Sequence, residues 1–562
     1  MAKYTIGIDF GTLSARAILV DVKTGKECPE SGVFDYPHAV METELPSGKK
    51  LPYDYALQHP QDYLDAISFV VPEVLKANNV SPDDVIGLGI DFTACTVFPI
   101  DADGTPLCLT EKYSDNPLAY VQLWKHHGAQ EEANQLTATA VIRGETFLAR
   151  YGGKASSETL FPRLWKIAKD DPELYADMDQ YVEAGDWIVG QITGSYVRNS
   201  CAAGYKALYH EREGYPSKEF FKALDPALEN VIEEKIAKSP VRPIGTKAGE
   251  INAAGSKLTG LNEGTAVAVA MIDAHAGVPG TLKEAAENQM VLIMGTSGCQ
   301  MSICKDEHIV PGCFGVVKDG MLPGFYGYEC GQSGFGDHYA WFVENCVPEK
   351  YAVAAREQGK DLHQYLTELA DKLVPGESGL LALDWWNGNR SILVDNDLTG
   401  LMMGLRLTTR PEEIYRALIE ATAFGTRVII DNLDRSGCPT EAIFATGGIA
   451  LKNPMLMQIF ADITGRPFKI AGSKYGASLG SAVMGALAAG TERGGYDNIF
   501  DATAVMANLT DIEYQPIPEH VAVYDKLYEQ FLKLHDYFGR DGSDAMKVLK
   551  QIQLDAIAAK GE

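Results

Sequence analysis

The sequence predicts an α/β protein that contains two copies of one unit. Three observations lead to this fold class. The chain of 562 residues is too long for a single hydrophobic core. Short apolar strand patterns alternate with helical patterns along it. A turn centred on Gly-Thr between two strands occurs at residues 11–12 and again at 295–296. A duplicated unit with a ligand cleft between the two copies is the expected arrangement.

In the first half, residues 4–8 and 15–22 read as the two strands of a hairpin, with the turn at 9–12. A helix is expected from about 59 to 77, where Pro72 should bend or interrupt it. A short apolar strand follows at 85–90 and ends at Asp91.

The second half repeats this pattern, with strands at 289–293 and 299–304 around a glycine turn. An apolar strand at 266–271 precedes the turn, and helices are expected from Pro454 and from Gly476. The predicted boundary near 277–290 gives domains at 1–280 and 286–500. Residues 501–562 are expected to form a C-terminal extension of helices without strand alternation.

Composition excludes several functions. Lysine and arginine total 49 against 76 aspartates and glutamates, a net charge of −27, and no basic patch is visible. Binding to nucleic acid or to an anionic membrane surface is therefore not expected. The ten cysteines show neither C-x-x-C spacing nor a cysteine–histidine zinc pattern, and no segment resembles a signal peptide or a membrane span. A cytoplasmic location is expected, and a homo-oligomer is left open.

Common nucleotide motifs are missing. There is no Walker A loop and no Rossmann fingerprint. Asp9-Phe10-Gly11 spells the protein-kinase triplet, but no glycine loop precedes it and no H-R-D occurs, so that match is accidental.

The first hairpin is a candidate phosphate site. Its turn exposes backbone N–H groups, and Gly11 allows a phosphate to approach closely. Thr12 and Ser14 add hydroxyl donors, Arg16 adds a cation, and Asp9 could hold phosphate-bound magnesium through water. The alternative is an ordinary hairpin with a polar tip.

Three further segments carry candidate site residues. Asp273, at the end of a buried strand, could be a general base or could cap the next helix. Gly447 and Gly448 would let a flat ligand lie on the backbone, and Asn453 could bond a purine edge or cap a helix. The small residues from Gly476 onward could instead serve close helix packing.

Taken in order, five motifs resemble the FGGY carbohydrate kinases over nearly the whole chain. The motifs are IGIDFGTLSARA at 6–17, IDAHAG at 272–277, MGTSG at 294–298, TGGIALKNPMLMQIFAD at 446–462 and GASLGSAVMGA at 476–486. The resemblance implies two ribonuclease-H-like domains of the actin-like ATPase superfamily, with a cleft between them.

The resemblance also implies phosphoryl transfer from MgATP to the terminal hydroxyl of a ketopentose. In this scheme Asp273 is the general base, and Asp9 organises Mg²⁺. The phosphates and the adenosine would be bound by the residues of the glycine turns: Gly11, Thr12, Ser14, Arg16, Gly295, Thr296, Ser297, Gly447, Gly448 and Asn453.

The segments at 90–107, 123–127, 201–210, 327–342 and 383–390 are most similar to members that phosphorylate ribulose, at the 5-hydroxyl. The sugar would contact Asp273 together with Thr93, Ala94, Trp124, Lys206 and Glu329. One departure is that Trp124-Lys125-His126 has no acid where the family's W-x-D pattern has one. Kinases of xylulose or another ketose remain an alternative, and a chaperone-like or filament-forming ATPase is a more remote one.

Overall fold

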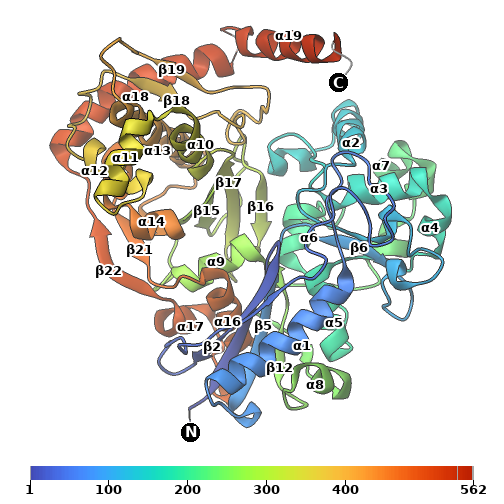
Figure 1. Cartoon of the computed structure of the whole chain (residues 1–562). Coiled ribbons are helices and arrows are strands. Elements are labelled where there is room, and N and C mark those ends of the chain that lie inside the picture. Colours follow the sequence, from blue (N-terminus) through green and yellow to red (C-terminus); the bar gives the residue numbers. More distant parts are fainter. Residues whose placement is uncertain (1, 541, 560–562) are drawn as a thin grey trace.

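Two mixed β-sheets form the centre of the molecule (Figure 1). The computed structural model describes residues 2–540 and 542–559. The strands of the first sheet run in the order β11-β12-β5-β1-β2-β3, with β13 beside β5. Their bounds are β1 Tyr4–Phe10, β2 Ser14–Asp21, β3 Gly32–Asp35, β5 Val85–Phe92, β11 Lys247–Glu250, β12 Ala266–Ala268 and β13 Met271–Ile272.

The second sheet has the order β16-β17-β15-β14-β20-β21-β22. Its strands are β14 Gln289–Met294, β15 Gly298–Cys304, β16 Gly315–Lys318, β17 Tyr326–Gln332, β20 Ala442–Thr446, β21 Phe468–Ala471 and β22 Leu509–Tyr514. β14 is antiparallel to β15 and parallel to β20, just as β1 is antiparallel to β2 and parallel to β5. The duplication of one α/β unit is thereby confirmed.

Helix α16 (Gly476–Ala489), from the second half, packs on the first sheet and on α9 (Asp273–Thr281). Glycines make this contact possible. A Cβ on Gly7 of β1 would lie 1.7 Å from the carbonyl oxygen of Ser478, and a Cβ on Gly480 would lie 1.7 Å from that of Ala276. The small residues after Gly476 therefore do serve close packing, and α16 connects the two halves.

An insertion in the first half carries a small sheet of order β4-β7-β6-β8, seen on the right of Figure 1 with its helices. These strands are β4 Leu57–Gln58, β6 Val97–Ile100, β7 Val121–Gln122 and β8 Gln180–Glu183. The first-half helices are α1 Pro60–Ala77, α2 Gln130–Arg143, α3 Leu160–Asp170, α4 Pro172–Asp177, α5 Ala184–Thr193, α6 Ser200–Lys206, α7 Lys218–Leu224 and α8 Ala253–Thr259.

Helices also surround the second sheet, with a short ribbon of β18 (Leu381–Leu383) and β19 (Leu401–Met403) above it. The remaining helices are α10 Gly336–Cys346, α11 Glu349–Glu357, α12 Leu362–Ala370, α13 Pro411–Arg435, α14 Gly448–Lys452, α15 Pro454–Thr464, α17 Ile499–Met506, α18 Pro518–Gly539 and α19 Ala545–Ala559.

Three local predictions differ at least in part from the structure. Helix α1 runs through Pro72, so the predicted interruption is absent; Pro72 lies on the exposed side of the helix, and the opposite face is buried. The strand expected at 266–271 is two short strands, β12 and β13. Helix α9 continues to Thr281 and β14 begins at Gln289, so the segment between them lies within the predicted boundary region 277–290.

The C-terminal extension is not wholly helical, because β22 pairs antiparallel with β21 at the edge of the second sheet. Residues along β22 are half-buried or exposed, so no apolar alternation marked this strand in the sequence.

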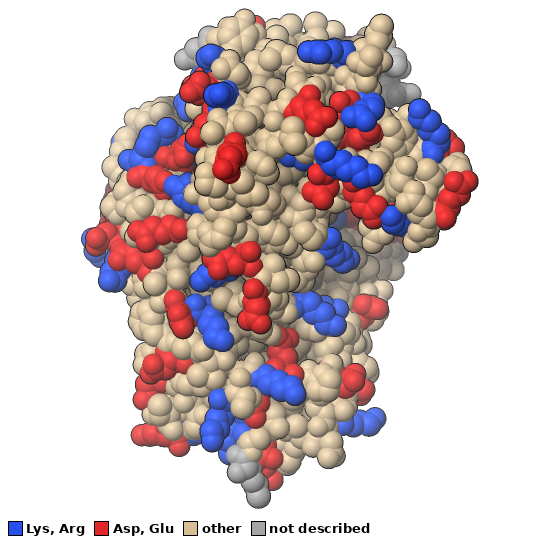
Figure 2. Space-filling view, turned by 90° about the vertical axis from the view of Figure 1, so that its left-hand side faces the viewer, with Lys and Arg blue, Asp and Glu red and all other residues tan. Residues whose placement is uncertain are grey.

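Acidic and basic side chains are interspersed on the face shown in Figure 2. Among the described residues, no helix combines the length with the hydrophobicity that crossing a membrane requires.

Candidate active site

Three carboxylates meet at one edge of the first sheet. Asp9 is near the end of β1 and lies opposite Asp91 of β5 in parallel register. β13 pairs in parallel with β5 on its other side, and Asp273 follows β13 directly. Because the carboxyl ends of parallel strands share one edge, the three side chains come from three neighbouring strand ends.

Asp91 was not assigned a role among the predicted site residues. It is fully buried, and its Oδ2 accepts a 2.5 Å hydrogen bond from the hydroxyl of Ser481 on α16. Burial and the neighbouring Asp9 raise the pKa of Asp91 well above its usual value. Of the two carboxyls, Asp9 is the one that lines a cavity. The sequence did contain a signal: Ile90-Asp91-Phe92 repeats Ile8-Asp9-Phe10.

The Asp9 carboxylate is the one available to a cation. Burial raises its pKa, while the hydrogen bond from Asp91 and the charge of Arg16 oppose that rise. Arg16 pairs across the hairpin with Asp9, and its guanidinium lies 4.6 Å from the ring centre of Tyr475. An ionised carboxylate at the edge of a cavity fits a magnesium ion held through water.

Asp273 occupies the first turn of α9, where its Oδ1 accepts a 2.7 Å hydrogen bond from the N–H of Ala274. This bond goes to the adjacent amide, whereas a helix cap would bind an amide two or three residues on. Burial, and then the charge of Asp9, raise the pKa of Asp273 to about 7. A carboxylate with this pKa is suited to take a proton at neutral pH.

The two glycine turns are alike but differ in span: the Gly11 N–H bonds to the third residue along the chain, and the Gly295 N–H bonds to the second. The Gly11 N–H donates to the Ser14 carbonyl at 2.9 Å, and the Gly295 N–H donates to the Ser297 carbonyl at 3.0 Å. Gly295 and Thr296 are exposed. Each turn leaves backbone and hydroxyl groups free for an anion, as a phosphate site requires.

A cavity of about 590 Å³ joins residues of both halves. Asp9, Gly11 and Asp273 line it from the first half, and Gly447 and Gly448 from the second. Gly447 has φ of 105°, and a Cβ there would lie 2.3 Å from the carbonyl oxygen of Met294. Glycine is therefore required at 447.

A second cavity of about 950 Å³ adjoins the first, since Gly448 and Lys452 line both. Gly295, Thr296 and Asn453 also line it. Asn453 caps α15, because its Oδ1 accepts the N–H of Leu456 at 3.0 Å. Asn453 therefore caps a helix and also borders a cavity large enough for a nucleotide.

Lys206 and Glu329 approach one another across the two halves. Lys206 ends α6 and Glu329 is in β17, and Lys206 Nζ lies 3.8 Å from a Glu329 carboxylate oxygen. Although burial opposes it, the charge of Lys206 and the neighbouring His275 hold the pKa of Glu329 well below its usual value. Both side chains border a small cavity that Arg390 also lines.

His275 and Arg390 were not predicted. His275 is fully buried, and its Nε2 lies 3.4 Å from Glu329. Arg390, from the loop before β19, lies 3.8 Å from Glu158 of the first half. His275 lies in the IDAHAG motif at 272–277, and Arg390 ends the segment at 383–390, but neither pattern indicated the contact that its side chain makes.

Trp124 and Thr93 lie against the first hairpin. The Trp124 indole N–H donates to the Thr12 hydroxyl at 3.1 Å, and the Thr93 N–H donates to the Phe10 carbonyl at 3.2 Å. Trp124 is 37% exposed, so part of its side chain is accessible to a ligand. Ala94 follows Thr93 directly and is half-buried.

A fully buried arginine on α3 holds these loops in place. Arg163 donates to the carbonyl oxygens of Cys95, Gln122, Trp124 and His126, and to that of Ser157. Its five N–H groups thereby fix the segments that carry Ala94 and Trp124. Nothing in the sequence marked it.

Comparison with known proteins gives consistent matches along the chain. The models of the N-terminal and C-terminal domains of the FGGY family of carbohydrate kinases match residues 4–280 and 290–489. A ribulokinase of Geobacillus thermodenitrificans is 51% identical over 559 residues, covering 99% of this chain and 98% of the relative. A ribulokinase of Anoxybacillus flavithermus is 52% identical with the same coverage.

Among solved structures, a xylulose kinase from Rhodospirillum rubrum matches with a TM-score of 0.76 at 21% identity, covering 95% of this chain and 98% of that one. Plasmodium falciparum glycerol kinase with ADP matches with a TM-score of 0.74 at 14% identity, covering 95% and 98%. At these identities the structural matches show a shared fold.

Proposed function

The chain belongs to the FGGY family of carbohydrate kinases, and we propose that it transfers the γ-phosphoryl group of ATP to the 5-hydroxyl of ribulose. The observation that carries the proposal is Asp273, a carboxylate of raised pKa on the wall of a cavity shared by both halves. The ribulokinase relatives at 51% and 52% identity over nearly the whole chain support ribulose as the acceptor.

In the proposed reaction the sugar hydroxyl oxygen attacks the γ-phosphorus, and the bond from that phosphorus to the bridging oxygen of ADP breaks. Asp273 accepts the hydroxyl proton. The turns at Gly11-Thr12 and Gly295-Thr296 bind phosphate oxygens through their N–H and hydroxyl groups. Asp9 would hold Mg²⁺, which supplies charge neutralisation on the phosphates when bound.

The acceptor would lie between Trp124 and the pair Lys206–Glu329. The exposed part of the Trp124 side chain suits the carbon face of a sugar, and the charged pair suits its hydroxyl and carbonyl oxygens. Gly447, Gly448 and Asn453 would border the adenosine in the larger cavity.

A substrate panel tests the proposal. ADP release is measured with MgATP and L-ribulose, D-ribulose, L-xylulose, D-xylulose or glycerol. We expect kcat/KM to be highest for a ribulose. A clear preference for a xylulose would reassign the acceptor, and ADP release that no sugar stimulates would remove the kinase proposal.

A further inference from the structure

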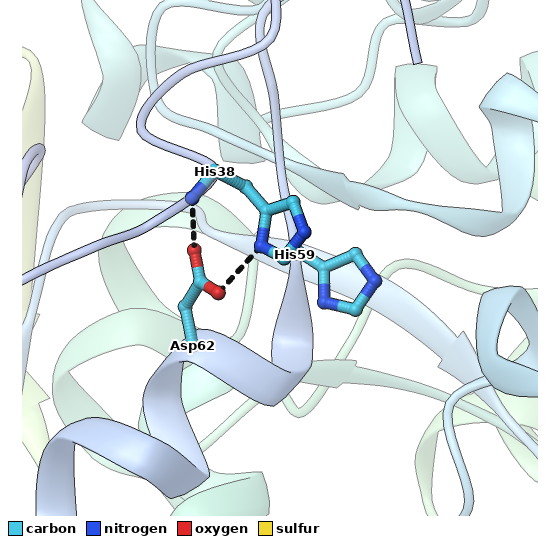
Figure 3. A group of neighbouring side chains, drawn as sticks. All are labelled: His38, His59 and Asp62. Atoms are coloured by element: carbon cyan, nitrogen blue, oxygen red, sulfur yellow. Dashed lines mark hydrogen bonds and ion pairs between the residues drawn. The ribbon is translucent and has the colours of Figure 1, made fainter. Parts of the chain in front are cut away.

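Two histidines and an aspartate form a cluster at the start of α1, in the first half of the chain (Figure 3). His59 immediately precedes the helix, Asp62 is in its first turn, and His38 comes from the loop after β3. Among the described residues this is the one group of three His, Cys, Asp or Glu side chains whose ligand atoms all lie within 4.8 Å of one another.

The cluster is built around a buried carboxylate. Asp62 is 1% exposed, and its two oxygens accept the backbone N–H of His38 at 3.1 Å and the His38 Nδ1 at 2.7 Å. The rings of His38 and His59 stack with centroids 4.3 Å apart. His59 Nδ1 is buried and has no hydrogen-bond partner. An unpaired buried nitrogen beside a buried carboxylate is costly unless a ligand occupies it.

We propose that His38, His59 and Asp62 bind a divalent transition-metal ion such as Zn²⁺, at a site separate from the kinase centre. Two imidazoles and one carboxylate are a donor set that zinc accepts and that magnesium, which prefers oxygen ligands, does not favour. Water would complete the coordination from the side of His38, whose ring is 37% exposed.

The required adjustment is small. Ligand atoms around a tetrahedral zinc lie about 3.4 Å apart, at about 2.0–2.1 Å from the metal. The ligand atoms now lie up to 4.8 Å apart. Rotation of the two rings would bring them to the shorter distance, and the His38–Asp62 contact would be exchanged for bonds to the metal.

The site is connected to the phosphate hairpin. Gln58, which precedes His59, donates to the Thr12 carbonyl at 2.7 Å, and the hydroxyl of Tyr63, which follows Asp62, donates to Gln58 Oε1 at 2.6 Å. A metal that fixes His59 to Asp62 also fixes this support for the hairpin.

The test is zinc titration of the full chain, without a histidine tag and stripped with a chelator, in a large excess of Mg²⁺. Bound zinc is measured by calorimetry, and Co²⁺ substitution gives an absorption spectrum that reports nitrogen ligands. We expect one site that His38→Asn and His59→Phe each weaken by about tenfold or more. His38→Asn keeps a donor for Asp62, and His59→Phe keeps the ring stacking, so both variants should fold.

The chain offers a matched control. His520 and Asp462 form a similar pair, 2.8 Å apart with the aspartate 2% exposed, and no second histidine completes that group among the described residues. His520→Asn should leave zinc affinity unchanged. The proposal is overturned if the wild-type chain binds no zinc, if neither cluster variant lowers the affinity, or if His520→Asn lowers it equally.

Discussion

Replacing Asp273 with asparagine should abolish most turnover while making the protein more stable at alkaline pH. The side chains have the same shape, and asparagine Oδ1 can still accept the N–H of Ala274. The variant loses only the proton acceptor, so we expect kcat to fall by about 10²–10⁴-fold. Binding of sugar and MgATP should change little.

The stability gain follows from the pKa. Burial and Asp9 raise the pKa of Asp273 from 3.8 to about 7, so the folded state disfavours the ionised form. The penalty grows as the pH rises above 3.8 and is complete above about 7. A shift of about three units corresponds to about 4 kcal/mol, and partial solvent access reduces this to about 2–4 kcal/mol. Asparagine is never charged and removes the penalty.

Thermal unfolding of both proteins, without ligands, at a series of pH values from 5 to 9 measures the effect. The unfolding midpoint of Asp273→Asn should exceed that of the wild type by an amount that increases up to about pH 7 and then stays constant. Two results would contradict the reasoning: near-normal turnover, or a stability difference that does not depend on pH.

Four further outcomes are expected. The kcat/KM of the wild type should fall about tenfold per pH unit below about pH 7, as Asp273 becomes protonated; a profile flat to pH 5 would exclude it as the base. Glu329→Gln should raise the KM for the ketose about 10–100-fold with little change in the KM for ATP, measured by steady-state kinetics, because a charge-assisted bond is lost. Gly480→Ala should destabilise the fold by about 1–3 kcal/mol, since its Cβ would lie 1.7 Å from a carbonyl oxygen, whereas Gly277→Ala, with 3.8 Å of room, should not. Arg163→Lys should lower the unfolding midpoint and raise the KM for the sugar, because most of five carbonyl contacts lose their donor.

Those parts of the fold that depend on local pattern could be predicted from the sequence. The hairpins around Gly11 and Gly295 are short apolar strands joined by a glycine turn, and the structure has both. β5 was recognisable as a strand because nearly all of its residues are apolar or glycine. In the structure all eight are buried, as is typical of a central strand. Edge strand β22 lacks such a pattern, and its place depends on pairing with β21, which is distant in sequence.

The same distinction applies to the candidate site. Residues within glycine turns and at strand ends, such as Asp9 and Asp273, could be found because the motif and the position coincide. Arg163 could not, and neither could the contact of His275 with Glu329, although His275 lies in the IDAHAG motif, because these contacts join segments that only the fold brings together.

Asp91 is the instructive intermediate case. Its motif repeats that of Asp9, and parallel pairing of β1 with β5 places the two carboxylates side by side. Two adjacent buried carboxylates cannot both be ionised at low cost, and burial, then the charge of Asp9, raise the pKa of Asp91 well above its usual value, although the hydrogen bond from the Ser481 hydroxyl opposes that rise. That hydroxyl belongs to α16, whose approach depends on the glycines of β1 and β5. The packing of α16, a helix from the opposite half of the chain, therefore separates the two aspartates: Asp91 is enclosed, whereas Asp9 lines the cavity.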